Sequence, residues 1–412
     1  MATASSPARA RPADAADLGR AIDMARQAPF YATSAWREAF ALEAPTLARL
    51  PRVTKSQLRE HSPEGFLPAG VDLKTLLASG DVEEESTSGT SGASVRVVFG
   101  RTWWAEQEGR ALRQNPFIAE ILDRAPDLRR AVLTTPGCSG VSCYNRWLSR
   151  EQRTLGASLF VNQARIPFSL GEEKSAVMAA EVSAWAPGFL DVDPVHGAWF
   201  ALHCERHGLR FPSLRFILTS YEFTSCRHRA IMERVFGVPV INLYGSSETG
   251  HLLVEAGDRM RPSPATALLE VADVDAAGVG ELLVTTLTNP FLPLIRYEIG
   301  DYVEARGDGY RVHGRKRDAL RGSGGRVVTT HQVDRLMEAA AGVVHYQLRQ
   351  AADGTARLCL LPEVPGDALT TIGRELAASL GALLGHPVTA ETVGFITPED
   401  SGKFRLTLRE SA

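Results

Sequence analysis

VPVINLYGSSETG, residues 238–250, contains the change of pattern that decides the fold. Residues 238–243 form a short apolar run typical of a buried strand, whereas residues 244–250 are polar and contain two glycines. Ligands in open α/β sheets bind beyond the carboxyl ends of the strands, so Ser247 and Glu248 stand where a phosphate contact and a Mg²⁺ ligand are expected. Taken alone, the same residues also fit a polar loop with a solvated glutamate.

Similar apolar runs recur on either side of this strand and alternate with helix-length stretches. Further strands are expected at 95–100, 131–135 and 214–220, and helices at 173–186, 197–207 and 226–236. This alternation predicts an α/β fold, with a large N-terminal domain whose mostly parallel sheets are covered by helices. Residues 266–313 are rich in strand patterns and glycine turns, which predicts an attached β-subdomain.

Glycine and charged residues replace the apolar pattern over residues 314–325, which predicts a domain boundary. The elements expected beyond it are a strand at 326–328, a helix at 331–341, strands at 343–350 and 356–361, a helix at 366–384 and a strand near 390–396. This β-α-β-β-α-β order is the ferredoxin-like pattern. We therefore predict a disordered tail over 1–20, a body over 21–313 and a small α+β domain over 314–412, joined to the body by a hinge.

Composition limits the classes of function. The 412 residues include 45 Lys and Arg against 48 Asp and Glu, a net charge of −3, which lacks the basic excess of a nucleic-acid-binding protein. Five scattered cysteines argue against a disulfide framework and favour a reducing compartment. No apolar run approaches the roughly 18–20 residues of a membrane span. We expect a soluble, cytoplasmic protein of more than one domain.

Three further segments hold residue types suited to nucleotide chemistry. Ser86–Gly92 is a run of hydroxyl residues and glycines whose backbone N–H groups can converge on a polyphosphate, although a flexible connector has the same composition. Asp301, after Gly300, is either a turn residue or a carboxylate that accepts hydrogen bonds from ribose hydroxyls. Lys403 lies close to the end of the chain, where a solvated charge is the ordinary interpretation.

In this order and spacing, the segments resemble the adenylate-forming superfamily of acyl- and aryl-coenzyme A ligases, peptide-synthetase adenylation domains and luciferases. The phenylacetate–coenzyme A ligase branch is the most similar, on the basis of PFY at 29–31, LPRVTKSQLRE at 50–60 and GELLVTTLTNPFLPLIRYEIGD at 280–301. The resemblance covers residues 25–408. It implies that residues 21–313 bind ATP and a carboxylic acid, and that residues 314–412 form a mobile lid carrying Lys403.

The resemblance also implies roles for individual residues. Lys403 is similar to the lysine that reaches the α-phosphate and the substrate carboxylate, and Glu248 to the Mg²⁺ ligand. The ATP phosphates would contact Ser88, Gly89, Thr90, Ser91, Gly92 and Ser247. Adenine and ribose would contact Ser220, Tyr221, Glu222, Tyr244, Asp301 and Arg315. The substrate pocket would be lined by Cys138, Val141, Tyr144 and Gly245, and the hinge would lie at Arg317 and Asp318.

The implied activity is ATP-dependent adenylation of an aromatic or heteroaromatic carboxylic acid, with release of pyrophosphate, and then transfer of the acyl group to a thiol. ATP and Mg²⁺ are the expected cofactors and coenzyme A is the expected acceptor, with the enzyme a monomer or homodimer. Several alternatives stay open. In the first, the acceptor is a carrier protein, an amine or a reductase instead of coenzyme A. In the second, the enzyme activates nitrite, and in the third, the chain is an inactive nucleotide-binding scaffold.

The sequence departs from the family pattern at Arg96, after the phosphate loop, at Glu298, where the family has an arginine, and at Arg317, in place of the hinge aspartate. These departures leave adenylation supported and weaken the assignment of coenzyme A as acceptor. Metal-binding patterns are also weak. Cys138 and Cys143 lack a third and fourth ligand at zinc-finger spacing, and we interpret His203, Cys204 and His207, which share one expected helix, as packing or solvated residues.

Overall fold

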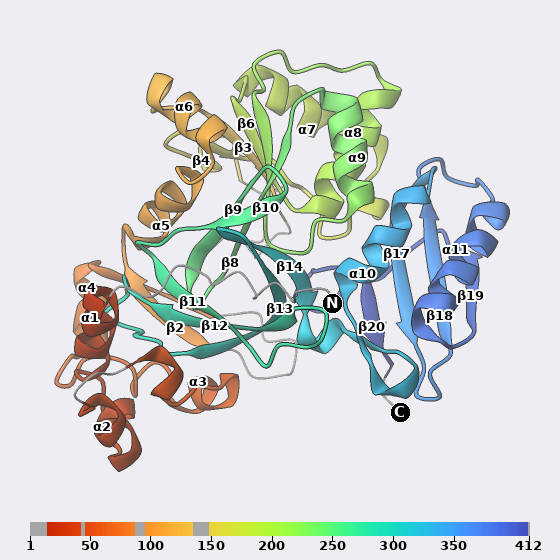
Figure 1. Cartoon of the computed structure of the whole chain (residues 1–412). Coiled ribbons are helices and arrows are strands. Elements are labelled where there is room, and N and C mark those ends of the chain that lie inside the picture. The colour runs from red at the N-terminus through yellow and green to blue at the C-terminus, as the bar shows by residue number, and fades with distance from the viewer. Residues whose placement is uncertain (1–14, 43–45, 87–94, 135–147, 411–412) are drawn as a thin grey trace. The chain divides into compact units, whose positions relative to one another are not determined.

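The computed structural model describes residues 15–42, 46–86, 95–134 and 148–410. These form two compact units, each built from two stretches of chain: unit 1 comprises residues 1–120 and 243–313, and unit 2 comprises residues 121–242 and 314–412. Strand β8 (Val240–Ser246) begins in unit 2 and ends in unit 1. Figure 1 labels the elements of both units.

The parallel sheet expected from the sequence lies in the first stretch of unit 2. Its strands run in the order β5-β3-β6-β7-β8 with parallel pairing, and β4 adds an antiparallel edge. Figure 1 shows helices α7, α8 and α9 beside these strands, with which they share one apolar core. The bounds are β3 Arg130–Leu133, β4 Thr154–Leu155, β5 Ser158–Phe160, α7 Glu172–Trp185, β6 Phe189–Val192, α8 Pro194–Arg206, β7 Phe216–Thr219 and α9 Cys226–Phe236.

Unit 1 corrects the expectation of mostly parallel sheets. Its strands follow the order β11-β12-β13-β14-β10-β9, and β9 lies beside the end of β8. The pairs β8–β9, β9–β10, β10–β14, β11–β12 and β12–β13 are antiparallel. The run at 95–100 forms β2, which pairs antiparallel with β1 in a separate two-stranded sheet. The bounds are β1 Val82–Ser86, β2 Arg96–Gly100, β9 Gly250–Ala256, β10 Arg259–Pro262, β11 Ala267–Ala272, β12 Val279–Thr286, β13 Tyr297–Arg306 and β14 Gly309–Arg315.

Most of the helices of unit 1 come from the N-terminal third of the chain. Helix α1 begins at Ala15 and buries Leu18, so the predicted tail over 1–20 is wrong for residues 15–20, while residues 1–14 lie outside the described residues. The bounds are α1 Ala15–Ala25, α2 Ser34–Phe40, α3 Lys55–His61, α4 Leu73–Ser79, α5 Trp103–Leu112 and α6 Pro116–Arg124. Within the described residues, no helix is long and apolar enough to cross a membrane.

The second stretch of unit 2 has its own sheet, in the order β19-β18-β17-β20. The predicted first strand, at 326–328, does not join it, because β16 pairs with β15 and the place beside β17 is taken by the parallel strand β20. The predicted last strand, near 390–396, ends earlier as β19. The bounds are β15 Leu320–Arg321, β16 Val327–Val328, α10 Thr330–Leu336, β17 Val343–Gln350, β18 Ala356–Pro362, α11 Thr370–Leu384, β19 Val388–Thr392 and β20 Thr407–Arg409.

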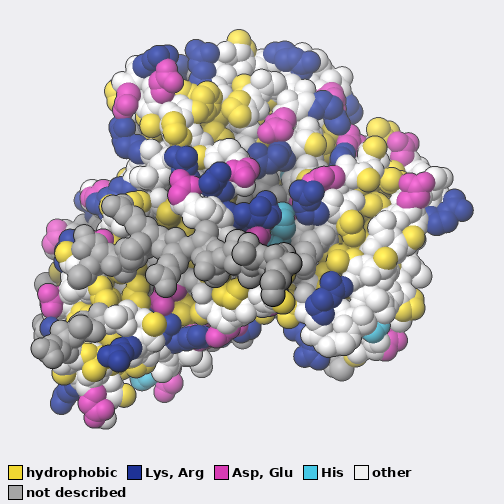
Figure 2. Space-filling view, viewed as in Figure 1, with side chains coloured by type: hydrophobic (Ala, Val, Ile, Leu, Met, Phe, Trp, Pro, Cys, Tyr) yellow, Lys and Arg dark blue, Asp and Glu magenta, His cyan; other side chains and the backbone are white. Residues whose placement is uncertain are grey.

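Charged side chains of both signs share the surface. On the face drawn in Figure 2, Lys and Arg side chains are interspersed with Asp and Glu side chains rather than gathered into one basic band. This mixture agrees with the nearly balanced count of charges in the sequence.

Candidate functional site

Glu248 follows the end of β8 and is almost fully buried, with 4% of its surface exposed. Lys55 Nζ lies 3.5 Å from Glu248 Oε1, and the Tyr297 hydroxyl donates a 3.3 Å hydrogen bond to the same oxygen. Burial opposes ionisation of Glu248, yet its pKa lies below the ordinary value because the Lys55 ammonium and the Ser246 hydroxyl stabilise the carboxylate. The site therefore presents an ionised, buried carboxylate.

Glycine permits the tight turn that presents Glu248. A Cβ atom on Gly245 would lie 2.2 Å from the carbonyl oxygen of Gly250, so a side chain at this position would push β8 away from β9. Gly250 itself has a φ of +70°, which favours glycine. The predicted role of Gly245 as a pocket floor is untested, but its lack of a side chain has this structural reason.

Tyr244 and Asp301 lie next to each other in unit 1. The Tyr244 hydroxyl donates a 2.6 Å hydrogen bond to Asp301 Oδ2, which joins β8 to β13. Gly300, immediately before Asp301, has a φ of +90°. The two residues predicted to contact adenine and ribose are thus close enough to contact one nucleoside.

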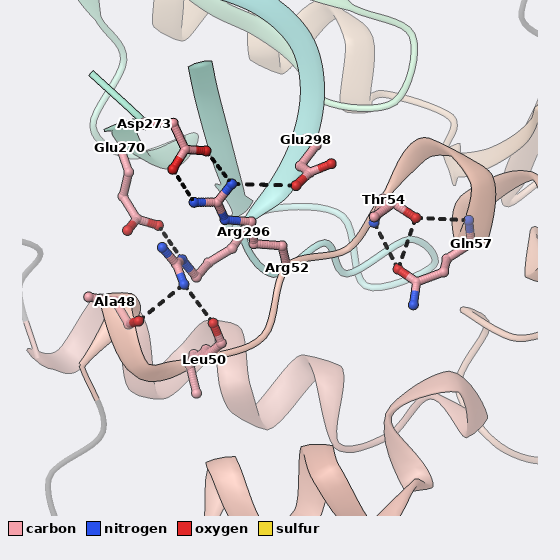
Figure 3. A network of polar contacts seen from close by, with 9 residues as sticks. All are labelled: Ala48, Leu50, Arg52, Thr54, Gln57, Glu270, Asp273, Arg296 and Glu298. Carbon is pink, nitrogen blue, oxygen red and sulfur yellow. Dashed lines mark hydrogen bonds and ion pairs between the residues drawn. The ribbon is translucent and has the colours of Figure 1, made fainter. Parts of the chain in front are cut away.

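A polar network anchors β13 to the segment that leads into α3, which carries Lys55 (Figure 3). The Arg296 guanidinium donates hydrogen bonds of 2.7 Å to the Leu50 carbonyl and 3.0 Å to Glu270. Arg296 has a positive φ of 48°, unusual for a side chain of this size, which these contacts compensate. These contacts hold in place the segment of chain that leads to Thr54.

Two local features complete this anchor. Thr54 and Gln57 form a reciprocal capping box at the start of α3. Glu298, one of the departures from the family pattern, lies 3.6 Å from Arg52, whose guanidinium also donates a 2.7 Å hydrogen bond to Asp273. Glu298 therefore takes part in an ion-pair network rather than standing alone.

In unit 2, a second polar cluster lies beyond the carboxyl ends of β6 and β7. Tyr221 has a φ of +74°, a strained conformation for a bulky residue and one that is frequent at functional sites. The hydroxyls of Ser220 and Tyr221 lie 3.4 and 3.5 Å from the two carboxylate oxygens of Asp191. Asp193, at the N-cap of α8, accepts a hydrogen bond from the Val195 amide at 3.1 Å.

Glu222 connects this cluster to the C-terminal stretch of unit 2. Its Oε2 atom accepts a 2.7 Å hydrogen bond from the backbone amide of Phe404. Burial raises the pKa of Glu222 well above its ordinary value, and the neighbouring Asp193 carboxylate raises it further, whereas the Lys403 ammonium acts in the opposite direction. The last effect places the charge of Lys403 close to Glu222.

Lys403 belongs to a formed turn rather than a loose tail. The Gly402 amide donates to the Glu399 carbonyl at 2.8 Å, and the Glu399 amide donates to the Lys403 carbonyl at 2.9 Å. Phe404 and Leu406, on either side of Arg405, are buried, and β20 begins at Thr407. The backbone is therefore held in place both before and after Lys403.

The two predicted hinge residues contact this same turn. The Arg317 guanidinium donates a 2.8 Å hydrogen bond to Glu399, and Arg405 Nε lies 2.7 Å from Asp318 Oδ1. Burial raises the pKa of Asp318, and the neighbouring Arg405 opposes that effect. Arg315, at the end of β14, is a further positive charge near Asp318.

The described candidate residues thus form two groups, one in each unit. Unit 1 contains Tyr244, Gly245, Ser247, Glu248 and Asp301. Unit 2 contains Ser220, Tyr221, Glu222, Arg315, Arg317, Asp318 and Lys403. The predicted phosphate loop, Ser88 to Gly92, and the pocket residues Cys138, Val141 and Tyr144 lie outside the described residues. Arg96, the departure from the family pattern that follows the phosphate loop, is paired with Glu84 and Glu64.

Sequence reasoning missed three residues of these groups. Asp193 follows a buried strand and precedes a helix that begins with Pro194, so the rule that led to Glu248 also points to it. Lys55 and Tyr297 lie far from residue 248 in the sequence and no local pattern links them to it.

No protein-family model matches the sequence, and no curated protein matches it in a sequence comparison. Solved structures do match. A 2-hydroxyisobutyryl-CoA ligase in the postadenylation state with R3-HIB-AMP has a TM-score of 0.71 at 17% identity, over 97% of this chain and 90% of that one. The chain therefore shares the fold of this CoA ligase.

Two further structures share the fold over a smaller part of the chain. The anthranilate CoA ligase AuaEII in complex with anthranoyl-AMP has a TM-score of 0.56 at 17% identity, over 79% of this chain and 65% of that one. The amide bond synthetase McbA from Marinactinospora thermotolerans has a TM-score of 0.52 at 16% identity, over 78% of this chain and 66% of that one.

Proposed function

We propose that this protein adenylates a carboxylic acid with ATP, releases pyrophosphate and then transfers the acyl group to a thiol, with coenzyme A as acceptor. The observation that supports it most is the position of Lys403. The hydrogen bond from Phe404 to Glu222 holds the backbone beside Lys403 at the carboxyl end of β7, the edge at which open α/β sheets bind ligands. A lysine in a solvated tail would have no such support.

The chemistry explains why a lysine is needed. A carboxylate becomes an acyl donor when one of its oxygens attacks the α-phosphorus of ATP, which forms acyl-AMP and expels pyrophosphate. Two anionic groups approach each other in this step, so a positive charge that is already in place stabilises the transition state more than the ground state. In the proposal, Lys403 supplies that charge, and Tyr244 and Asp301 bind the adenosine.

Glu248 is the proposed ligand of Mg²⁺. The donor fits the ion, because Mg²⁺ prefers hard oxygen ligands and is commonly bound by one or two carboxylates together with substrate phosphates. The carboxylate is buried and its pKa is low, so it is ionised at neutral pH. Bound there, the ion would neutralise the phosphate charge of ATP. Lys55 and Tyr297 hold the Glu248 carboxylate in place.

The proposed substrate is an aromatic or heteroaromatic acid. Its support is the resemblance to the phenylacetate–coenzyme A ligase branch and the shared fold with an anthranilate CoA ligase. A 2-hydroxyisobutyryl-CoA ligase, whose structure matches over 97% of this chain, makes short hydroxy acids the alternative. The test is a panel of aromatic and short hydroxy acids, scored by pyrophosphate release and hydroxylamine trapping. We expect activity with aromatic acids. No turnover with any acid would contradict adenylation of a carboxylate.

An amine is the second candidate acceptor. The hinge residue Arg317 departs from the family pattern and is bound to Glu399, in the turn that holds Lys403, and an amide bond synthetase shares the fold. The same panel run with coenzyme A, with a primary amine and with neither separates the two. Acceleration by coenzyme A alone supports the thiol, whereas acceleration by the amine alone supports amide formation.

A further inference from the structure

Three metal-ligand side chains meet at one end of the helix pair α7 and α8 in unit 2. Within the described parts of the chain, a ligand atom from each of Glu172, His203 and His207 lies within 4.8 Å of the other two. Glu172 is the first residue of α7, and the two histidines lie four residues apart at the end of α8, on the same helix face. Their ring centroids are 4.5 Å apart.

One carboxylate oxygen of Glu172 faces both histidines. His203 Nδ1 lies 2.9 Å from Oε2, and His207 Nε2 lies 3.1 Å from the same oxygen. The other oxygen, Oε1, accepts a 3.1 Å hydrogen bond from Arg206. Arg206 therefore orients the carboxylate and leaves Oε2 directed at the imidazoles.

His203 Nδ1 is the buried ligand atom of this group. The side chain is buried, with 2% of the residue exposed, and Nδ1 makes no hydrogen bond to any residue that the structure describes, although a carboxylate oxygen lies 2.9 Å away. Nδ1 of His203 on α8 and Oε2 of Glu172 on α7 are therefore close enough for one cation to bind both atoms.

We propose that Glu172, His203 and His207 bind a divalent transition metal ion of the zinc class. Two imidazoles and one carboxylate are a known ligand set of zinc sites that keep a fourth position open. With ligand bonds of about 2.0–2.2 Å, tetrahedral geometry separates neighbouring ligand atoms by roughly 3.3–3.5 Å. The measured contacts of 2.9 and 3.1 Å need to open by only a few tenths of an ångström, and the exposed Glu172 side chain is able to move.

The fourth position of this site faces a cavity of about 570 Å³, which Glu172, His203 and His207 themselves help to line. The rest of its wall is mostly apolar, with Ala176, Ala179, Ala180, Leu209 and Phe211. The site stands apart from the carboxyl-edge cluster, because His203 is ten residues along α8 from Asp193, or about 15 Å at 1.5 Å per residue. It is therefore an independent site, open to a small ligand that coordinates the ion.

The test is binding of Co²⁺ and Zn²⁺ to chelator-treated full-length protein. The wild type should bind one equivalent of Co²⁺ with the visible absorption of a tetrahedral complex, and Zn²⁺ should displace it and raise the melting temperature. His203→Ala, His207→Ala and Glu172→Gln should each weaken binding by at least about 10–100-fold. Glu173→Gln, at the neighbouring exposed acid on the same cavity, and His386→Ala are the matched controls and should bind as the wild type does.

Because Glu172 is exposed, Glu172→Gln tests the site without disturbing the core, should His203→Ala fold poorly. Absence of stoichiometric binding by the wild type would overturn the proposal, as would equal affinity in Glu172→Gln and Glu173→Gln. Imidazole added to the cobalt protein should change its spectrum, and an unchanged spectrum would contradict an open fourth position.

Discussion

The backbone amide of Phe404 donates a 2.7 Å hydrogen bond to the carboxyl group of Glu222, so the residue after Lys403 is attached to the carboxyl end of β7. The two residues are 182 positions apart in the sequence. This bond makes Glu222 a positioning residue for Lys403 in addition to its predicted place beside adenine.

Glu222→Ala should therefore lower kcat for adenylation by about 10-fold, the effect of about 1.4 kcal/mol in the transition state. Glu222→Gln keeps an oxygen acceptor for the Phe404 amide and should retain most of the activity. The readout is kcat and KM for ATP by pyrophosphate release, with the loss expected in kcat. Equal activity of Glu222→Ala and the wild type would show that the bond does not position Lys403.

Lys55 should control the pH at which Glu248 becomes ionised. The Lys55 ammonium helps to hold the pKa of the buried Glu248 below its ordinary value, and without it burial would raise that pKa. Because the proposed role of Glu248 requires the carboxylate, Lys55→Met should move the acidic limb of the pH–rate profile upward by about 1 pH unit. Lys74→Met, at an exposed lysine on α4, is the control, and an unmoved limb in Lys55→Met would refute the coupling.

Asp334 should make the protein less stable as the pH rises. Burial raises its pKa to about 6 from the ordinary 3.8, although the Cys226 amide and the Tyr346 hydroxyl donate hydrogen bonds to it. Between pH 3.8 and 6 the folded state keeps a proton that the unfolded state releases, so stability is highest below this window and falls through it. The shift corresponds to about 3 kcal/mol.

Urea unfolding at pH 4 and pH 7 measures this effect. The wild type should lose about 2.4 kcal/mol more than Asp334→Asn between the two pH values, because the amide does not ionise and part of the loss has already occurred at pH 4. The same pH dependence in both proteins would show that Asp334 is not responsible.

Arg317 and Glu399 should act as a coupled pair. Their 2.8 Å contact belongs to a group of four charged residues with Asp318 and Arg405, and both side chains are partly shielded from solvent. In a double-mutant cycle of Arg317→Ala and Glu399→Ala, we expect a coupling free energy of unfolding of about 1 kcal/mol. Additive effects of the two substitutions would mean that the contact contributes nothing to stability.

The parallel strands of unit 2 were predictable because each is a short apolar run separated from the next by a helix-length segment, as at β6, α8 and β7. The antiparallel pairing in unit 1 was not, because an apolar run such as residues 95–100 shows that a strand is buried and not which strand it pairs with. Strand β20 has only three residues, too few to show a period.

The candidate site also has one part that the sequence predicts and one part that only the folded structure shows. Glu248 could be found from its position after a strand, and Asp193 by the same rule, whereas the roles of Lys403 and Asp301 came from the resemblance to a family. The contacts of Glu248 with Lys55 and of Glu222 with Phe404 join residues more than a hundred positions apart, and only the folded chain brings them together. The sequence favours packing or solvated roles for His203 and His207, because it does not show that Glu172 lies close to both of them in the fold.

The most direct test of the proposed activity is a single-turnover experiment that follows acyl-AMP formation from ATP and an aromatic acid accepted in the panel. The account predicts that the wild type forms the adduct and that Lys403→Ala forms it about 10²–10³-fold more slowly while still binding ATP. Lys74→Ala, which removes an exposed charge from α4, should match the wild type. Acyl-AMP formed at the wild-type rate by Lys403→Ala would contradict the account.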